Sequence, residues 1–339
     1  MQPLNVAVIG VGHLGKEHAR IFAGMEGVRL VGVVDTNPDR LKAVAKKHGV
    51  PGHSDYRALL DQVQAVSLVV PTVAHHAIAL DFLERGVPIL VEKPMCKNLE
   101  QARELVDLAR RKGTLLQIGH IERFNPAVEA LQAEVVNPRF IECHRLSSFS
   151  FRSTDIGVVL DLMIHDIDII LHLVRSRVVH VDAVGVSILG KDEDIANARL
   201  VFENGCVANV TASRVSVQGM RKIRIFANDR YISLDYQAKT AAIFKKGPKL
   251  RERGFDAAKI DPTKIADLKA LLFGELIERR DLKIDNNGEP LVRELRSFID
   301  CVRTKTEPVV PGEHGLRAME VADMIQKRIK ESSRTVGGA

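Results

Sequence analysis

Asp161 and His165 stand four residues apart in the apolar stretch 158–174, a spacing that puts both side chains on one face of a helix. Asp168 follows three residues later, close to the same face. Polar groups in a segment suited to burial need partners or a purpose, and an imidazole that titrates near neutral pH suits acid–base chemistry. Two other interpretations stay open: a buried histidine satisfied by its carboxylate neighbours, and a metal site of Asp161, His165 and His172.

Lys93 offers a second reactive group, an ammonium in the segment Glu92-Lys93-Pro94 at the end of a predicted strand. Pro94 biases Lys93 toward an extended backbone, which carries its side chain outward from the strand. The segment Pro71-Thr72-Val73-Ala74-His75-His76 follows another predicted strand. Because the carboxyl ends of strands in an open parallel sheet face the ligand crevice, we expect both segments there. Ordinary polar loops are the alternative.

A glycine-rich turn opens the chain: Gly10-Val11-Gly12-His13-Leu14-Gly15 matches G-x-G-x-x-G between a predicted strand and a predicted helix. In this context Gly10 permits a tight turn, Gly12 lets a pyrophosphate approach the backbone, and Gly15 lets the helix pack against the strand. The helix N-terminus adds free N–H groups and a partial positive charge. The motif predicts a dinucleotide site, with a plain strand-to-helix turn as the alternative.

Asp35 ends an apolar run 20 residues after Gly15, where the dinucleotide fingerprint has an acidic residue. Its carboxylate would bind the adenosine ribose and repel a 2′-phosphate, which favours NAD over NADP, although Arg40 lies near enough to keep NADP open. As an alternative, Asp35 caps the next helix. Hydride transfer by NAD needs no metal. The predicted cofactor-binding residues are Gly10, Gly12, His13, Leu14, Gly15, Asp35, Pro71, Thr72, His75, Glu92 and Lys93.

The elements that must position these groups alternate regularly over the first 120 residues. Asn37 and Pro38 predict a helix start, and Gly86 and Gly113 predict helix ends. The alternation predicts an α/β fold with an N-terminal Rossmann doubly wound parallel sheet covered on both faces. Apolar runs typical of its buried strands lie at 5–9, 28–34, 65–70, 87–91 and 114–118.

The alternation of strands and helices stops after residue 120, and consecutive strand-like runs continue to residue 244. Between two of these runs, Glu203-Asn204-Gly205 is typical of a hairpin turn. This pattern predicts a C-terminal α+β domain with a large, open, mostly antiparallel sheet, closed by helices at 290–303 and 315–331. The charged segment 245–286 is typical of a surface excursion. At ~100–200 residues per domain, 339 residues suggest two. We predict their limits at 1–120 and 121–339.

The composition excludes several classes of protein. With 45% hydrophobic and 27% charged residues the chain is globular rather than disordered. It lacks an apolar run of ~18 residues and a secretory signal, so we expect a cytoplasmic protein without membrane insertion. Aromatic residues, at 4% with no Trp, argue against a surface that stacks the bases of single-stranded nucleic acid, and we expect no nucleic-acid partner. The cysteines, which show no zinc spacing and predict reduced thiols, are Cys96, Cys143, Cys206 and Cys301.

Taken in order, these motifs resemble those of the Gfo/Idh/MocA oxidoreductases over nearly the whole length. The resemblance implies an NAD-binding Rossmann domain joined to a substrate-binding α/β domain whose open sheet commonly forms homodimers or homotetramers. It implies a substrate site lined by Lys93, Asp161 and His165, with His75 beside the nicotinamide. One departure is that a Gly-rich run before the Asp/His pair is reduced to Gly157. The motifs are Gly10–Gly15, Asp35, Glu92-Lys93-Pro94, Asp161-x-x-x-His165 and Glu313-His314-Gly315.

At a finer level, the run from Gly119 to Pro126, GHIERFNP, resembles dehydrogenases of lipid A biosynthesis that oxidise the 3-hydroxyl of UDP-N-acetylglucosamine with NAD. By this resemblance Arg123 and Asn125 contact the sugar or its phosphates. His165 would take the hydroxyl proton, Asp161 would orient it, and Lys93 would stabilise the developing alkoxide. The alternatives are an inositol or simple aldose dehydrogenase of the same family and an NAD-binding redox sensor without turnover.

Overall fold

The computed structural model describes residues 2–132, 134–149, 156–252, 256, 258, 271–284 and 288–336. By internal packing the chain forms two compact units, Met1–Asn125 with Asn287–Met324, and Pro126–Asn286 with Ile325–Ala339. The domain limits given by the sequence, 1–120 and 121–339, stay a prediction. Within the described residues, the helices are too short or too polar to cross a membrane.

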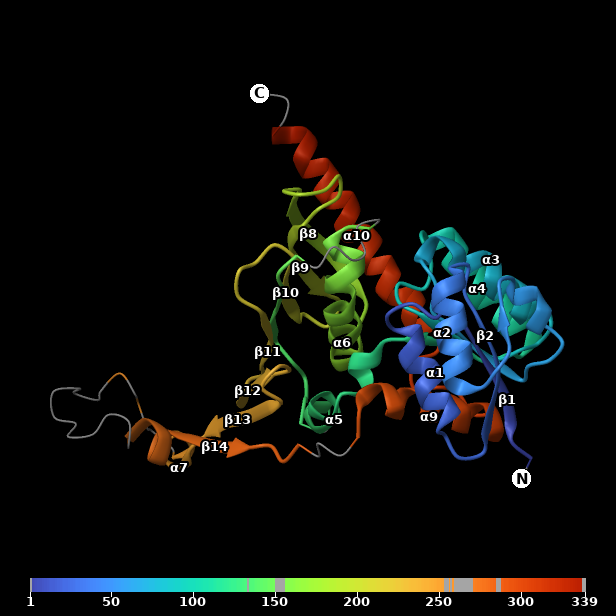
Figure 1. Cartoon of the computed structure of the whole chain (residues 1–339). Coiled ribbons are helices and arrows are strands. Elements are labelled where there is room, and N and C mark those ends of the chain that lie inside the picture. The colour runs from blue at the N-terminus through green and yellow to red at the C-terminus, as the bar shows by residue number, and fades with distance from the viewer. Residues whose placement is uncertain are drawn as a thin grey trace. The chain divides into compact units, whose positions relative to one another are not determined.

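The first unit is built on a six-stranded sheet in the order β3-β2-β1-β4-β5-β6, and every strand pair in it is parallel. Its strands β1 and β2 are labelled in Figure 1. The strand order reverses between β1 and β4, the place where such sheets open a crevice. Its strands are β1 (Leu4–Ile9), β2 (Val28–Val34), β3 (Gly52–His53), β4 (Ala65–Leu68), β5 (Ile89–Glu92) and β6 (Leu116–Gly119). Its helices are α1 (Gly15–Ala23), α2 (Pro38–His48), α3 (Thr72–Glu84), α4 (Leu99–Lys112), α9 (Pro290–Thr304), and α10 (Gly312–Val336) as far as Met324.

Local signals in the sequence place the helix ends. Asn37 caps α2 by accepting the Arg40 N–H at 3.0 Å, with Pro38 at the first helical position. Gly113 ends α4 in the left-handed conformation. The core under the sheet joins distant segments, because Leu295 and Phe298 of α9 cluster with residues of α1 and β1. The predicted parallel α/β fold is confirmed.

The second unit carries an eight-stranded sheet in the order β14-β13-β12-β11-β7-β10-β9-β8. The β7–β10 pair is parallel and the other pairs are antiparallel, so the predicted, mostly antiparallel sheet is confirmed. Its strands are β7 (Phe140–Leu146), β8 (Val178–Val186), β9 (Ile195–Phe202), β10 (Val207–Ser213), β11 (Met220–Phe226), β12 (Arg230–Asp235), β13 (Thr240–Lys246) and β14 (Ile277–Asp281). Its described helical segments are α5 (Pro126–Gln132), η3 (Val159–Met163), α6 (Ile164–Val174), α7 (Pro248–Arg251), η6 (Leu271–Leu276) and α10 from Ile325.

The segment 245–286, which the sequence predicts to be a surface excursion, contains a strand that the sequence did not predict. Ile277–Asp281 forms β14, an edge strand paired with β13. Four of its five residues are exposed, so the strand has no buried face and leaves no alternation of apolar residues in the sequence. Much of the rest of 245–286 lies outside the described residues.

Candidate active site

The glycine-rich turn between β1 and α1 requires glycine at two of its three glycine positions. Gly10 has a φ of 90°, and a Cβ there would lie 2.3 Å from the Val69 carbonyl oxygen. A Cβ on Gly15 would lie 1.9 Å from the Gly10 carbonyl oxygen. By contrast, the nearest atom to a Cβ on Gly12 is Arg40 Nη1 at 3.8 Å. The loop is therefore closed beneath Gly10 and Gly15 and open at Gly12, as a phosphate-binding turn requires.

Asp35 fixes this turn to the end of β2. Its carboxylate accepts the Val11 N–H at 2.9 Å and the Asn37 N–H at 2.8 Å, one on each oxygen. Each oxygen of a carboxylate has a further lone pair, so the group can still accept from ribose hydroxyls. The alternative that Asp35 itself caps α2 is wrong, because the cap is the Asn37 side chain. His13 and Leu14, at the mouth of the turn, are exposed.

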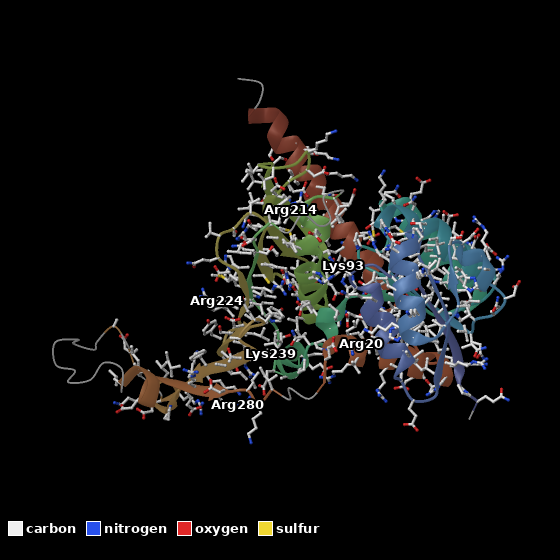
Figure 2. The ribbon with its side chains drawn as sticks, in the orientation of Figure 1. Arg20, Lys93, Arg214, Arg224, Lys239 and Arg280 are labelled. Carbon is white, nitrogen blue, oxygen red and sulfur yellow. The ribbon has the colours of Figure 1, made fainter. Side chains whose placement is uncertain are left out.

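Behind the end of β5 lies a buried chain of polar groups. Glu92 is 7% exposed, and its Oε1 lies 3.4 Å from His18 Nε2. The other ring nitrogen of His18 lies 2.8 Å from the Ser67 hydroxyl. The Glu92 carboxylate rests against Gly119, where a Cβ would approach it to 2.8 Å. Lys93, which follows directly, is half-buried (Figure 2). Sequence analysis missed His18, although its place on the apolar face of α1, four residues before Phe22, was a signal.

Glu294 of α9 adds a carboxyl group to the same interior. It is fully buried, and among the described residues no hydrogen-bond partner of its carboxyl oxygens is found. Burial, reinforced by the charge of Glu92, raises the pKa of Glu294 well above its ordinary value. A carboxyl group in such a place is held in the neutral form.

His75 connects the two loops that the sequence assigns to the crevice. It is 1% exposed, with Nδ1 3.0 Å from the Pro94 carbonyl oxygen and Nε2 2.9 Å from the Val70 carbonyl oxygen. Burial lowers its pKa, so the ring is favoured in the neutral form, which donates to one carbonyl at a time. His76 instead lies 2.7 Å from Glu104 of α4. The contact of His75 with a nicotinamide stays a prediction.

Arg123 and Asn125, the predicted substrate contacts of the first unit, have partners within that unit. Arg123 is 6% exposed, and its Nη2 lies 3.1 Å from His314 Nδ1. The Asn125 amide donates to Glu122 at 3.0 Å. The structure thus explains Glu313-His314-Gly315 in part, since His314 supports Arg123. The substrate role of both residues stays a prediction.

Asp161 and His165 lie in one helical segment of the second unit, both half-buried. The segment is not a uniform α-helix as the sequence predicts. Asp161 belongs to the wide π-turn η3, and His165 to the first turn of α6. Turns of this kind often occur at functional sites because they re-aim side chains. Asp168 is 2% exposed, and no cluster of the metal-ligating kind is found among the described residues.

The start of this segment is held by residues that sequence analysis missed. Asp194 accepts the backbone N–H groups of Ile188 and Leu189 at 2.7 and 2.6 Å and the Arg214 Nε–H at 2.8 Å. Burial opposes its ionisation, but these donors prevail and lower the pKa of Asp194 to about 2. Arg214, labelled in Figure 2, also donates to the Ile156 carbonyl at 2.8 Å. The loop between β8 and β9 thereby fixes the backbone just before Asp161.

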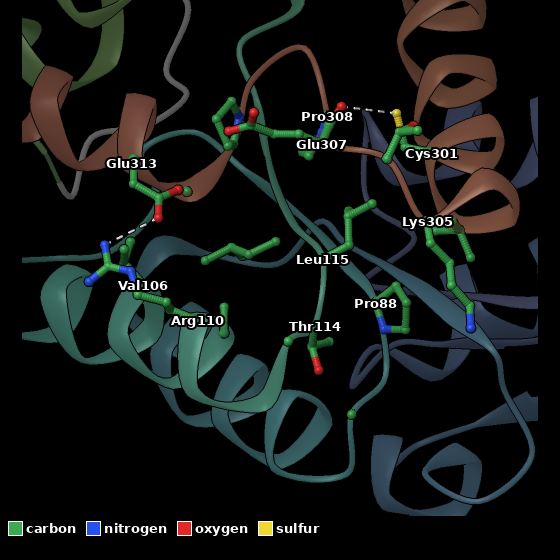
Figure 3. A pocket seen from close by; sticks show the side chains of 18 residues that line it. Pro88, Val106, Arg110, Thr114, Leu115, Cys301, Lys305, Glu307, Pro308 and Glu313 are labelled. Atoms are coloured by element: carbon green, nitrogen blue, oxygen red, sulfur yellow. Dashed lines mark hydrogen bonds and ion pairs between the residues drawn. The ribbon is translucent and has the colours of Figure 1, made fainter.

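A pocket of about 500 Å³ lies elsewhere in the first unit, between α4 and the chain that follows α9 (Figure 3). Pro88 and Leu115, which line it, precede β5 and β6 and therefore mark the amino edge of the sheet. Lys93 and Gly10 lie at the opposite, carboxyl edge. This pocket is therefore separate from the predicted cofactor site.

Comparison with known proteins gives matches over both units. The model described as the oxidoreductase family with an NAD-binding Rossmann fold, GFO_IDH_MocA, matches residues 4–120. The model of the GFO/IDH/MocA C-terminal domain matches residues 127–233.

Individual relatives agree with these models. A UDP-N-acetylglucosamine 3-dehydrogenase from Acidithiobacillus ferrooxidans is 41% identical over 266 residues, which cover 76% of this chain and 84% of that protein. The solved structure of the enzyme of that name from the same organism covers 98% of this chain and 99% of its own, with a TM-score of 0.85 and 34% identity. A scyllo-inositol 2-dehydrogenase (NAD(+)) from Bacillus subtilis is 30% identical over 233 residues, covering 63% of this chain and 68% of that protein.

Proposed function

Because the chain belongs to the Gfo/Idh/MocA oxidoreductase family and is an NAD-dependent dehydrogenase, we propose that it oxidises the 3-hydroxyl of UDP-N-acetylglucosamine to a ketone. The observation that carries this proposal is the 41% identity to a UDP-N-acetylglucosamine 3-dehydrogenase over 84% of that protein. A link to lipid A biosynthesis is part of the same proposal.

NAD, which the glycine-rich turn and Asp35 would hold, would supply the hydride acceptor for this reaction, and the protein positions the groups and moves the proton. His165 takes the hydroxyl proton, since an imidazole is neutral and basic near pH 7. Asp161 orients that imidazole or a neighbouring hydroxyl. Lys93 donates to the reacting oxygen and stabilises its negative charge. The proposal requires Lys93 and His165 to act on the same substrate molecule.

The direct test incubates the purified protein with NAD and a panel of UDP-N-acetylglucosamine, UDP-glucose, free N-acetylglucosamine and inositols while NADH absorbance is followed. We expect turnover with UDP-N-acetylglucosamine, and formation of deuterated NADH when its carbon 3 carries deuterium. Turnover confined to inositols or free aldoses would replace the proposal by the runner-up, which the similarity to scyllo-inositol 2-dehydrogenase supports. No turnover with any member would reject both.

We also propose that the protein is a homodimer or homotetramer assembled through the open face of the second sheet. Val184 and Val186 of β8 are 54% and 51% exposed on one face of that strand, which supports a contact surface there if further apolar residues adjoin them. Sedimentation velocity would test this, since a monomer at micromolar concentration contradicts it. The four buried free cysteines fit a reducing compartment such as the cytoplasm.

A further inference from the structure

The helix that carries His165 has a broad apolar surface. At about 100° per residue its apolar residues cover more than half of the circumference of α6, and His165, Asp168 and His172 share the remaining side. Its buried apolar residues are Ile164, Ile167, Ile169, Ile170, Leu173 and Val174. So broad an apolar face sets the rotation of a helix only coarsely, and Asp166 is the charged residue of α6 that lies within it.

Asp166 makes such a contact with Arg145 of β7. Arg145 Nε donates to Asp166 Oδ2 and Arg145 Nη2 donates to Oδ1, both at 2.8 Å. The side chains are 3% and 1% exposed, so the pair is buried. The Arg145 guanidinium also lies 5.5 Å from the centre of the Tyr236 ring. A two-pronged pair of this kind is satisfied in one relative orientation only, because both N–H groups must meet both oxygens in a plane.

His165 directly precedes Asp166, and consecutive helical residues point about 100° apart. When Asp166 is held against β7, the direction of the His165 side chain follows. A buried ion pair is weak evidence for stability, because well-packed apolar residues of similar volume often stabilise a fold as well or better. Its better-attested role is to specify one arrangement among competitors.

We propose that Arg145 and Asp166 are a positioning pair for the dehydrogenase reaction. By fixing the rotation of α6 they direct the His165 imidazole toward the substrate, on the same side of the helical segment as Asp161. This inference rests on the proposed function, in which His165 is the base. Neither residue of the pair touches the substrate or NAD in this role.

The main test replaces the pair by apolar residues, in Arg145→Met/Asp166→Leu, which removes the orientation without leaving a buried charge. We expect a melting temperature close to that of the unaltered protein, an unchanged Kd for NADH, and a kcat lowered by about 10-fold or more, the loss typical of a displaced acid–base group. A kcat within twofold of the unaltered value would overturn the proposal.

A second variant covers the case in which the double replacement does not fold. Arg145→Lys keeps the charge but supplies a point donor in place of the fork, and we expect kcat to fall with KM for NAD unchanged. The matched control is Arg224→Lys, which alters the exposed pair of Arg224 with Glu142 of the same strand β7 and should leave kcat unchanged (Figure 2). Equal kcat values in Arg145→Lys and Arg224→Lys would also overturn the proposal.

A readout without substrate separates this inference from the proposed function. In protein carrying ¹³C-labelled histidine, the ring signal of His165 should shift in both Arg145 variants, while the signal of His75, in the other unit, should not. A shifted His165 signal in a protein that oxidises no member of the panel would reject the proposed function but support the positioning role of the Arg145–Asp166 pair. An unshifted signal would reject the positioning role, whatever the substrate is.

Discussion

A Cβ on Gly157 would lie 2.2 Å from Oε1 of Glu193. The two residues meet at the start of η3, where Glu193 accepts the Val159 N–H on its side chain at 3.3 Å and the Val158 N–H on its carbonyl at 2.8 Å. Glu193 thus holds the beginning of the segment that carries Asp161. The single glycine left before the Asp/His pair is required here because the carboxylate occupies the space of a side chain.

We therefore expect Gly157→Ala to displace Glu193 and to destabilise the protein by about 1–3 kcal/mol, the usual cost of an overpacked site. Turnover should fall more than NADH binding. Thermal unfolding and steady-state kinetics measure both effects. Gly190→Ala is the matched control, since a Cβ there has its nearest atom at 3.6 Å. Equal stability and equal turnover of the two variants would contradict this prediction, because the Glu193 side chain would then move aside without loss of stability.

Glu294 predicts a dependence of stability on pH. Its folded pKa is raised above the ordinary 4.5 by burial and by Glu92, so above pH 4.5 the unfolded chain releases a proton that the folded protein keeps. Stability is then lost as pH rises from 4.5 through the folded pKa, by about 1.4 kcal/mol per unit of separation. Glu294→Gln, neutral at every pH, should gain stability relative to the unaltered protein over that range. Denaturant unfolding at several pH values tests this, with Glu289→Gln, at an exposed position, as the control. The same dependence of the unfolding free energy on pH in both variants would contradict the prediction.

His165→Ala and Lys93→Ala should each lower kcat by ~10²-fold or more, because each removes a group that moves a proton or stabilises the alkoxide. The Kd for NADH should change little in His165→Ala. Steady-state rates and NADH fluorescence titration measure the two quantities. Near-normal turnover in either variant would reject the role assigned to that residue.

Cofactor choice should depend on Asp35 and Arg40. The Asp35 carboxylate repels a 2′-phosphate, whereas the Arg40 guanidinium lies beside Gly12 and attracts one. We expect a preference for NAD that weakens by about 10-fold in Asp35→Asn, equivalent to ~1.4 kcal/mol, and returns when Arg40→Ala is added. The ratio of kcat/KM for the two cofactors is the measurement. An unchanged ratio in Asp35→Asn would place 2′-phosphate discrimination elsewhere.

The sequence predicted those structural features that depend on residues close together along the chain. Asn37, Pro38 and Gly113 act within one helix turn, and the glycines of the first turn act within one loop, so their patterns are legible along the chain. The parallel and mostly antiparallel sheets followed from the alternation of apolar runs, and both were confirmed. The exposed edge strand β14 was missed because it has no buried face.

Contacts between segments far apart in the sequence could not be predicted from it. Asp161 and His165 were placed in one helical segment, but the sequence did not predict that this segment begins with a π-turn, which contains Asp161 and whose first residue, Val159, donates its N–H to Glu193 of a distant loop. The Arg145–Asp166 pair joins a strand to a helix, and the sequence offered no reason to pair those two charges among 49 basic and 43 acidic residues. Such partners are decided by tertiary packing.

The packing of α9 into the first core has a consequence for biosynthesis. Leu295 and Phe298, buried beside Phe22 and Val8, come from the last fifty residues of the chain. A nascent polypeptide that has just left the ribosome with its first 125 residues lacks these side chains and exposes the apolar surface that they will cover. We expect that fragment alone to aggregate or to recruit chaperones, and the Rossmann sheet to mature only after synthesis of the intervening 160 or so residues, at roughly 5–20 residues per second.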